Sequence, residues 1–252
     1  FLNKNLFYSI YYDSSATLID SLTVWDFKIS APVALVYWTG TSALTLCDER
    51  HSTAMDWATH KYLHSSFGTR YISGFTPSYY IGSDIAIGFG LSSGIIADED
   101  IEIAINNGPI NGYFTQPINN IGQIPVYYRT GLDNQAGGWT KDAATSRPYK
   151  GGPTIAFNSL SSGTWGQTSV STNNYVSYFI YATDNIAEPI ISIQGQRQDS
   201  NLASAVQNNN PQSLLLLDLP IQEAKLLYRI ILQYNPSYLS NPFMVVITQV
   251  DD

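Results

Sequence analysis

The sequence predicts a mainly-β protein: an antiparallel β-sandwich or jelly-roll-like pair of sheets, with one or two short peripheral helices. Three observations support this fold class. Apolar runs of strand length, rich in β-branched and aromatic residues, recur along the whole chain. Gly, Pro, Asn and Ser, which are typical of turns, separate these runs. Several runs also alternate between apolar and polar residues with period two, which indicates strands that are buried on one face.

The apolar runs give the expected strands in order. They lie at residues 6–12, 16–29, 34–39, 43–48, 85–90, 94–106, 123–130, 154–159, 165–171, 175–182, 190–196, 213–218, 224–234 and 243–250. Ile101, Ile103 and Ile105 alternate with polar or small residues, so we expect them to face one way, as on a half-buried strand. The run 224–234 also fits a helical stripe. Its alternation and the hairpin-like partner at 243–250 favour a strand.

Two segments have helical signals. The first helix is expected over about residues 54–66, capped by Thr53 or the serine before it and ended by Gly68 in a left-handed conformation. The second is expected over residues 199–206, capped by Asp199 or the serine after it and ended by a run of asparagines.

The domain organisation follows from the uniform character of the strands. Residues 131–152 have the composition of a long surface loop or a boundary between subdomains. Because the strands on both sides are alike, we expect a single β-rich domain over residues 1–252, with residues 1–40 as a candidate N-terminal assembly segment. The chain begins with Phe1 rather than Met, so we also expect that a preceding segment is missing or has been processed off.

The composition excludes some classes of partner. Charged residues make up 13% of the chain, against roughly 25% in an average soluble domain, so neutral polar groups cover the surface. Such a surface suits an extracellular particle or a large assembly. The net charge is -8 and Lys and Arg form no runs, which argues against nucleic acid and anionic membranes as partners. No apolar run is long enough to span a membrane, and the single cysteine cannot form an internal disulfide.

One segment, CDERHSTAMDWATHKYLH at residues 47–64, contains every histidine of the chain, His51, His60 and His64, and its only cysteine. On the expected helix His60 and His64 are one turn apart, a spacing that two metal-binding imidazoles can use, and Cys47 or His51 could add a third ligand. The segment has no HExxH motif and no second cysteine. Three interpretations remain open: a packed or interface face of a helix, a metal site and an acid–base site. We favour the first.

Aromatic residues in turn-like contexts form a second candidate site. They are Tyr79, Tyr80, Tyr113, Trp139, Tyr149, Trp165 and Tyr238. Exposed rings of this kind stack on sugars or anchor protein interfaces, and the alternative is that they pack over strand ends. No nucleophile elbow or phosphate-binding loop is present. We therefore expect no catalytic residues and no cofactor, although a pair of carboxylates for polysaccharide cleavage remains a third hypothesis.

Several motifs follow one another along the chain in an order that is typical of one class of proteins. DERHSTAMDWATHKYLHSSFGTRYISGF is followed by IPVYYRTG, by a turn with WTKDAAT and by a strand with TW. YVSYFIYATDNIAEPIISIQGQ, a helix with DSNLASAVQ, and LLYRIILQYN complete the series. In this order, over residues 44–234, the motifs resemble structural proteins of tailed bacteriophages. The first forty or so residues lie outside the resemblance.

The resemblance implies a protein located in the virion, as part of a tail fibre, neck or head-attached appendage. Such proteins act by assembly, so we expect a homo-oligomer, with a trimer as first choice, in contact with other virion proteins. No catalytic residue is carried over by the resemblance. The alternative is a module that binds a host-surface carbohydrate through an aromatic platform, for which Trp139 or Trp165 would serve.

Overall fold

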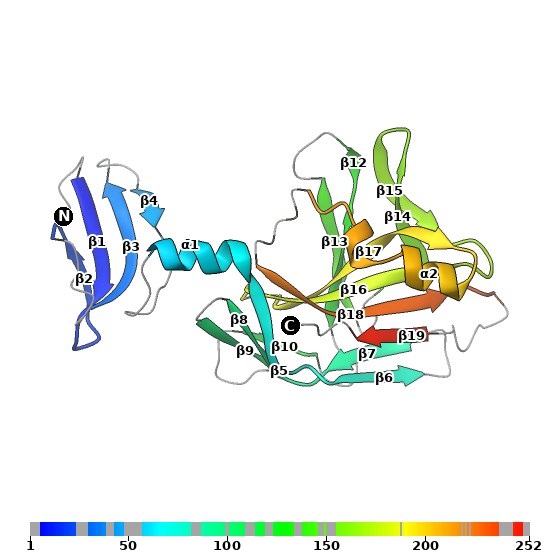
Figure 1. Cartoon of the computed structure of the whole chain (residues 1–252), viewed down its shortest axis with the longest axis horizontal. Helices are drawn as coiled ribbons and strands as arrows, with labels where there is room; N and C mark the ends of the chain where they lie inside the picture. Colours follow the sequence, from blue (N-terminus) through cyan, green and yellow to red (C-terminus); the bar gives the residue numbers. More distant parts are fainter. Residues whose placement is uncertain are drawn as a thin grey trace. The chain divides into compact units, whose positions relative to one another are not determined.

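The structure is a computed structural model (Figure 1). It describes residues 6–23, 30–38, 43–47, 57–81, 87–98, 101–108, 114–118, 123–133, 138–145, 149, 155–186, 188–217, 219, 221, 223–236 and 244–248. The protein is mainly β and sandwich-like, which confirms the predicted fold class. Among these residues, no helix combines the length and the apolar character needed to cross a membrane.

The chain divides into two compact units. The first comprises Phe1–Gly68 with Asp98–Ile101, and the second comprises Thr69–Ala97 with Glu102–Asp252. A segment boundary was expected near residue 40, whereas this division falls after Gly68. That the whole chain folds as one domain stays a prediction.

The first unit contains an antiparallel sheet of four strands in the order β2-β1-β3-β4. These are β1 (Leu6–Tyr12), β2 (Leu18–Ser21), β3 (Ala31–Trp38) and β4 (Ala43–Cys47). All four lie where the apolar runs predicted strands, although β3 begins three residues earlier than expected. The β1–β2 turn is fixed by the Asp13 carboxylate, which accepts hydrogen bonds from the backbone N–H groups of Ser15 and Thr17.

A helix follows the sheet. It is α1 (Trp57–Ser66), within the predicted span, and the residues expected to cap its start lie outside the described part of the chain. At its end, the N–H groups of Phe67 and Gly68 both point to the carbonyl oxygen of Leu63, at 2.7 and 3.3 Å. Gly68 has φ of 55°, the left-handed conformation predicted for this glycine.

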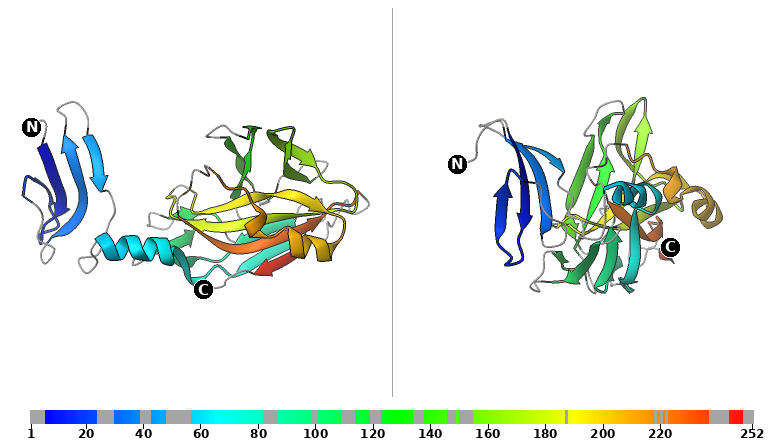
Figure 2. Two further views of the ribbon diagram at one scale, coloured as in Figure 1. Left: turned by 45° about the horizontal axis from the view of Figure 1, so that its top comes forward. Right: turned by 60° about the vertical axis from the view of Figure 1, so that its left-hand side comes forward.

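The remaining strands form the rest of the structure. They are β5 (Thr69–Gly74), β6 (Pro77–Ile81), β7 (Ile87–Leu91), β8 (Gly94–Asp98), β9 (Ile101–Asn107), β10 (Thr115–Gln116), β11 (Ile124–Arg129), β12 (Gly131–Leu132), β13 (Trp139–Thr145), β14 (Ala156–Ser161), β15 (Thr164–Ser169), β16 (Tyr175–Thr183), β17 (Ile190–Asp199), β18 (Ala224–Gln233) and β19 (Met244–Thr248). The largest sheet has the order β13-β11-β17-β16-β18-β19. Smaller sheets have the orders β10-β9-β8-β5, β12-β15-β14 and β6-β7. Figure 2 shows β16, β17 and β18, in yellow and orange, side by side.

The six-stranded sheet is buried on both faces. On β16, Val176, Tyr178 and Ile180 enter one hydrophobic core, whereas Phe179 and Tyr181 enter a second core on the opposite face. The first core also contains residues of β7, β8, β9 and β14. Since both cores draw on this sheet, the sheet lies between two layers.

A buried arginine links the six-stranded sheet to the helix α2 (Leu202–Asn208). Arg229 of β18 is 4% exposed, and its guanidinium donates to the carbonyl oxygens of Val206 and Asn209 at the end of α2, at 3.0 and 2.9 Å. Burial disfavours the charged guanidinium and lowers the pKa of Arg229. The negative end of the helix dipole and these otherwise unpaired carbonyls partly offset that cost.

Several expectations need correction. The predicted loop at residues 131–152 contains β12 and β13, because the edge of β11 supplies backbone partners for β13. Helix α2 starts after Asn201, whose side chain accepts the Ser204 N–H at 2.8 Å, because β17 extends through Asp199. The antiparallel description is also incomplete: β11 and β17, and β9 and β10, pair in parallel.

Candidate functional site

The histidines predicted from the sequence are only partly placed. His60 and His64 fall on α1, one turn apart, whereas His51 lies outside the described residues. Over the described stretches, no group of three or more His, Cys, Asp or Glu side chains forms a candidate metal site. Metal binding by His51, His60 and His64 therefore stays a prediction.

The aromatic residues are mostly not the exposed platform that the carbohydrate alternative requires. Trp165 is 4% exposed and Tyr149 is 5% exposed, so both agree with the alternative interpretation, in which the ring packs against the fold. Trp139 is half-buried, and its indole N–H donates to the carbonyl oxygen of Leu217 at 2.9 Å. Tyr113 and Tyr238 lie outside the described residues, as do the side chains of the two tyrosines on β6.

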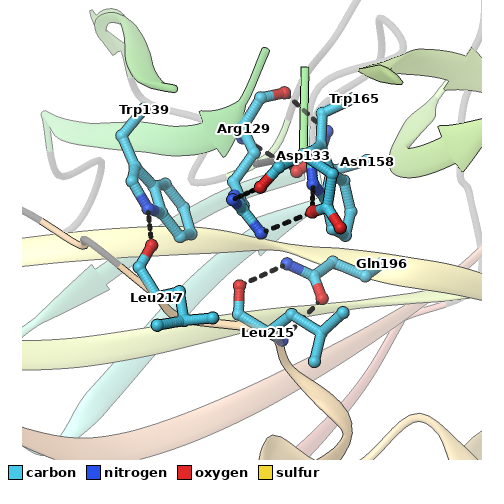
Figure 3. Close-up of polar contacts among 8 residues, drawn as sticks. All are labelled: Arg129, Asp133, Trp139, Asn158, Trp165, Gln196, Leu215 and Leu217. Carbon is cyan, nitrogen blue, oxygen red and sulfur yellow. Dashed lines mark hydrogen bonds and ion pairs between the residues drawn. The ribbon is translucent and has the colours of Figure 1, made fainter. Parts of the chain in front are cut away.

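Trp165 is covered by a buried arginine (Figure 3). Arg129, at the end of β11, is 3% exposed and places its guanidinium 4.7 Å from the centre of the Trp165 ring. The same guanidinium donates to the Asp133 carboxylate at 3.2 Å, which also accepts the indole N–H of Trp165. The cation, the carboxylate and the ring thus contact one another within the fold, although the buried Nε of Arg129 has no hydrogen-bond partner among the described residues.

Asn158 of β14 holds Arg129 from the other side. Its side-chain oxygen accepts the Arg129 backbone N–H, and its side-chain N–H₂ donates to the Arg129 carbonyl oxygen, both at 2.8 Å. A second donor hydrogen bonds to the carbonyl oxygen of Gly166 at 3.1 Å. We call this arrangement, in which one side-chain amide pairs with both backbone groups of another residue, an amide clamp. It reproduces, through a side chain, the two hydrogen bonds that residues of neighbouring strands exchange.

Two further amide clamps occur among the described residues of the second unit. Gln116 pairs with Ile190, accepting its N–H at 2.8 Å and donating to its carbonyl oxygen at 2.9 Å. Gln196 of β17 pairs with Leu215 in the same manner, at 2.7 and 3.2 Å. Side-chain amides therefore connect separate segments of this fold, in addition to charged residues such as Arg229.

The Gln196 clamp fixes an extended segment that covers the second core. This segment, residues 214–217, is called the strap. It follows the short 3₁₀ helix η1 (Pro211–Ser213) and belongs to no sheet, so the strand expected over residues 213–218 was wrong. The chain is extended there, but Gln196 and Trp139 provide the backbone partners that a neighbouring strand would otherwise provide.

The strap has an inner and an outer side. Leu214 and Leu216 pack on the second core, whereas Leu215 is 50% exposed and Leu217 is 72% exposed. The two exposed leucines are two residues apart, so on this extended backbone their side chains point to the same side. The strap therefore presents an apolar edge to solvent on a backbone that is held in place. Within the described structure, no other segment covers the side chains of Leu215 and Leu217.

Replacing Gln196 by Glu tests the clamp on the strap. A carboxylate keeps the acceptor for the Leu215 N–H but faces the Leu215 carbonyl oxygen without a donor, a loss of about 1 kcal/mol for this half-exposed group. We expect amides of the strap to exchange hydrogen several-fold faster in Gln196→Glu. The exposed Gln212, for which the same change is expected to have little effect, is the matched control. Equal exchange in both variants would show that the clamp does not hold the strap.

A second polar group lies beside this region and is structural at neutral pH. Tyr127 donates its hydroxyl proton to Glu188 at 2.7 Å, and Lys141 contacts both oxygens of that carboxylate at 2.7 Å. Burial, followed by the hydrogen bond and the charge of Glu188, raises the pKa of Tyr127 above its ordinary value. Burial also raises the pKa of Tyr181 to about 12. Both phenols remain neutral at neutral pH and do not act as bases there.

Sequence reasoning missed the amides that build this region. The only available signal was a polar side chain within an otherwise apolar strand run, as for Asn158 in AFNSL and Gln196 in IISIQGQ. No family model, curated protein or solved structure matches this chain. Its function must therefore be argued from its own residues.

Proposed function

We propose that this chain is a structural protein of a tailed-bacteriophage virion, part of a tail fibre, neck or head-attached appendage. It acts by assembling with other virion proteins. The virion placement rests on the ordered motifs of residues 44–234 that resemble such proteins. The low fraction of charged residues, 13% of the chain, also supports a mode of action by assembly.

The strap is the structural observation that supports a mode of action by assembly. Leu217 is the most exposed of the described large apolar side chains, and Leu215 lies beside it. Apolar groups on a preformed backbone bind with little loss of conformational entropy, which favours a partner surface over a ligand pocket. We assign the outer side of the strap to contact with another virion protein.

The arrangement of the polar groups supports assembly over carbohydrate binding. Arg129, Asp133 and Trp165 contact one another, and the indole N–H of Trp139 is taken by the strap. A sugar site needs exposed rings and polar groups that are available to hydroxyls. The carbohydrate alternative therefore lacks its platform at Trp165.

Virions that carry the double variant Leu215→Ser, Leu217→Ser test this assignment. The two side chains together lose about 2 kcal/mol of contact energy, so incorporation of the chain into particles should fall about tenfold or more. The purified variant should keep the melting temperature of the parent, because both side chains point outward. The matched control is Leu132→Ser, Leu160→Ser, which removes two other exposed leucines, at 49% and 42%, and should be incorporated normally. Normal incorporation of the strap variant would contradict the assignment.

A further inference from the structure

The backbone of the strap is held along one of its two edges. In an extended chain, the N–H and C=O groups of alternate residues point to opposite edges. At the first edge, the N–H and C=O groups of Leu215 bind the amide of Gln196, and the carbonyl oxygen of Leu217 accepts the indole N–H of Trp139 (Figure 3). These contacts fix the strap in place without a neighbouring strand.

The second edge of the strap is open at its centre. The N–H of Leu214 donates to the carbonyl oxygen of Pro211 at 3.1 Å, and the carbonyl oxygen of Leu216 accepts the N–H of Leu219 at 3.0 Å. Between these two turns, the carbonyl oxygen of Leu214 and the N–H of Leu216 make no hydrogen bond to a residue that the structure describes. An acceptor and a donor placed on either side of one residue are the pair to which a neighbouring strand binds.

The sequence of the strap does not prevent such pairing. Exposed strand edges commonly carry Lys, Pro or a bulge that stops another chain from adding to them, whereas residues 214–217 are all leucine. The backbone is extended, with φ of -77° and ψ of 132° at Leu214. The strap therefore has the conformation of a strand but no strand neighbour within the described part of the chain.

We propose that an extended segment of a neighbouring virion protein adds to the open edge of the strap as a β-strand. This inference rests on the proposed function and names the way in which its partner binds. The added strand would donate to the carbonyl oxygen of Leu214 and accept the N–H of Leu216. Apolar side chains at alternate positions of that strand would lie beside Leu215 and Leu217 and cover them.

The open backbone pair favours a strand over a helix as the partner. A helix would cover the exposed leucines, but its own backbone groups are already paired with one another. It would leave the carbonyl oxygen of Leu214 and the N–H of Leu216 without partners in an interface that excludes water, which is costly. An extended segment has free backbone groups and satisfies both.

Replacing Leu216 by proline tests the open edge. Proline removes the N–H of residue 216 and places its ring where the added strand would lie. The free chain loses no hydrogen bond, and Leu215, which precedes the substitution, is already extended as proline requires. The matched control is Leu216→Ala, which also removes the leucine side chain from the second core but keeps the N–H. Incorporation into particles should be about tenfold lower for Leu216→Pro than for Leu216→Ala.

The outcomes separate this inference from the proposed function. Equal incorporation of Leu216→Pro and Leu216→Ala would overturn the added strand and leave the proposed function intact, because the chain would still be part of the particle. A parent chain that is missing from washed particles would overturn both. Melting temperatures of the two purified variants show whether the proline variant folds, and if it does not, hydrogen exchange of the parent chain decides.

Hydrogen exchange measures the open edge without a substitution. In the free chain, the amide of Leu215 should exchange several-fold more slowly than that of Leu216, because Gln196 binds only the first. In washed particles, the Leu216 amide should become at least tenfold slower. A Leu216 amide that is as slow as that of Leu215 in the free chain would overturn the inference, because the edge would already be paired. A Leu216 amide that stays fast in the particle would overturn it as well.

Discussion

Asn158→Asp is expected to lower the free energy of unfolding by about 3–5 kcal/mol, a large part of the stability of an ordinary domain. Asn158 is 0% exposed, and its N–H₂ group donates to the carbonyl oxygens of Arg129 and Gly166. A carboxylate has the same shape but no donor. The variant would bury a negative charge against two carbonyl oxygens, and it would undo the clamp that positions the Arg129 backbone.

Urea unfolding measures this effect, and pH gives it a signature. Burial beside carbonyl oxygens raises the pKa of the new carboxyl in the folded state above its unfolded value of about 3.9. The loss of unfolding free energy in Asn158→Asp should therefore be small at a pH below the unfolded-state pKa. It should grow as the pH rises through the raised pKa of the folded state. Asn201→Asp is the matched control, because Asn201 caps α2 through its side-chain oxygen and Asp caps equally well. If Asn158→Asp were as stable as this control at neutral pH, the buried clamp would be disproved.

Gly195→Ala is expected to cost about 3 kcal/mol. A methyl group on Gly195 would lie 3.1 Å from the carbonyl carbon of Ser177, closer still to its oxygen, and 3.2 Å from Oδ1 of Asn209. Both Gly195 and Ser177 belong to central strands of the six-stranded sheet, so the backbone must shift to make room. Overpacking against backbone is costly because a backbone atom cannot rotate away. The shift would also displace the adjacent Gln196 and with it the strap.

Gly166→Ala is the matched control for this substitution. A methyl group on Gly166 would meet no atom within 4 Å, and this glycine also lies in a strand, β15. Its replacement should be neutral or slightly stabilising, since alanine has less freedom to lose on folding. Thermal unfolding of both variants provides the comparison. Similar melting temperatures would mean that the close approach of Ser177 to Gly195 is not a feature of the folded protein.

The central strands could be predicted because their side chains determine them. In Tyr175–Thr183 the run is apolar at almost every position, which is the mark of a strand between two layers. Alternation and a hairpin-like partner identified Ala224–Gln233 as a strand despite its partial helical pattern, and β18 does pair with β19 in antiparallel fashion. Gly68 was recognised as a helix end because glycine tolerates the left-handed conformation that it adopts. These features are local, so the sequence alone expresses them.

The missed elements depend on partners that are distant in the sequence. Trp139–Thr145 contains charged and small residues and has a weak strand tendency, yet it pairs with β11. The strap is held by Gln196, 19 residues before Leu215, and Arg129 is held by Asn158, 29 residues away. Nothing in a common amide side chain indicates which backbone group it will pair with. The histidines are conspicuous in the sequence because they are rare, and no candidate metal site occurs among the described residues, which do not include His51.

The central claim is that this chain is a building block of a virion, and its presence in purified particles is the most direct test. Particles of a tailed phage that encodes the chain can be banded by density, washed at high salt and analysed by quantitative mass spectrometry. The proposal predicts peptides from across residues 1–252 at a fixed number of copies per particle. A chain that is abundant in the infected cell but missing from washed particles would contradict it.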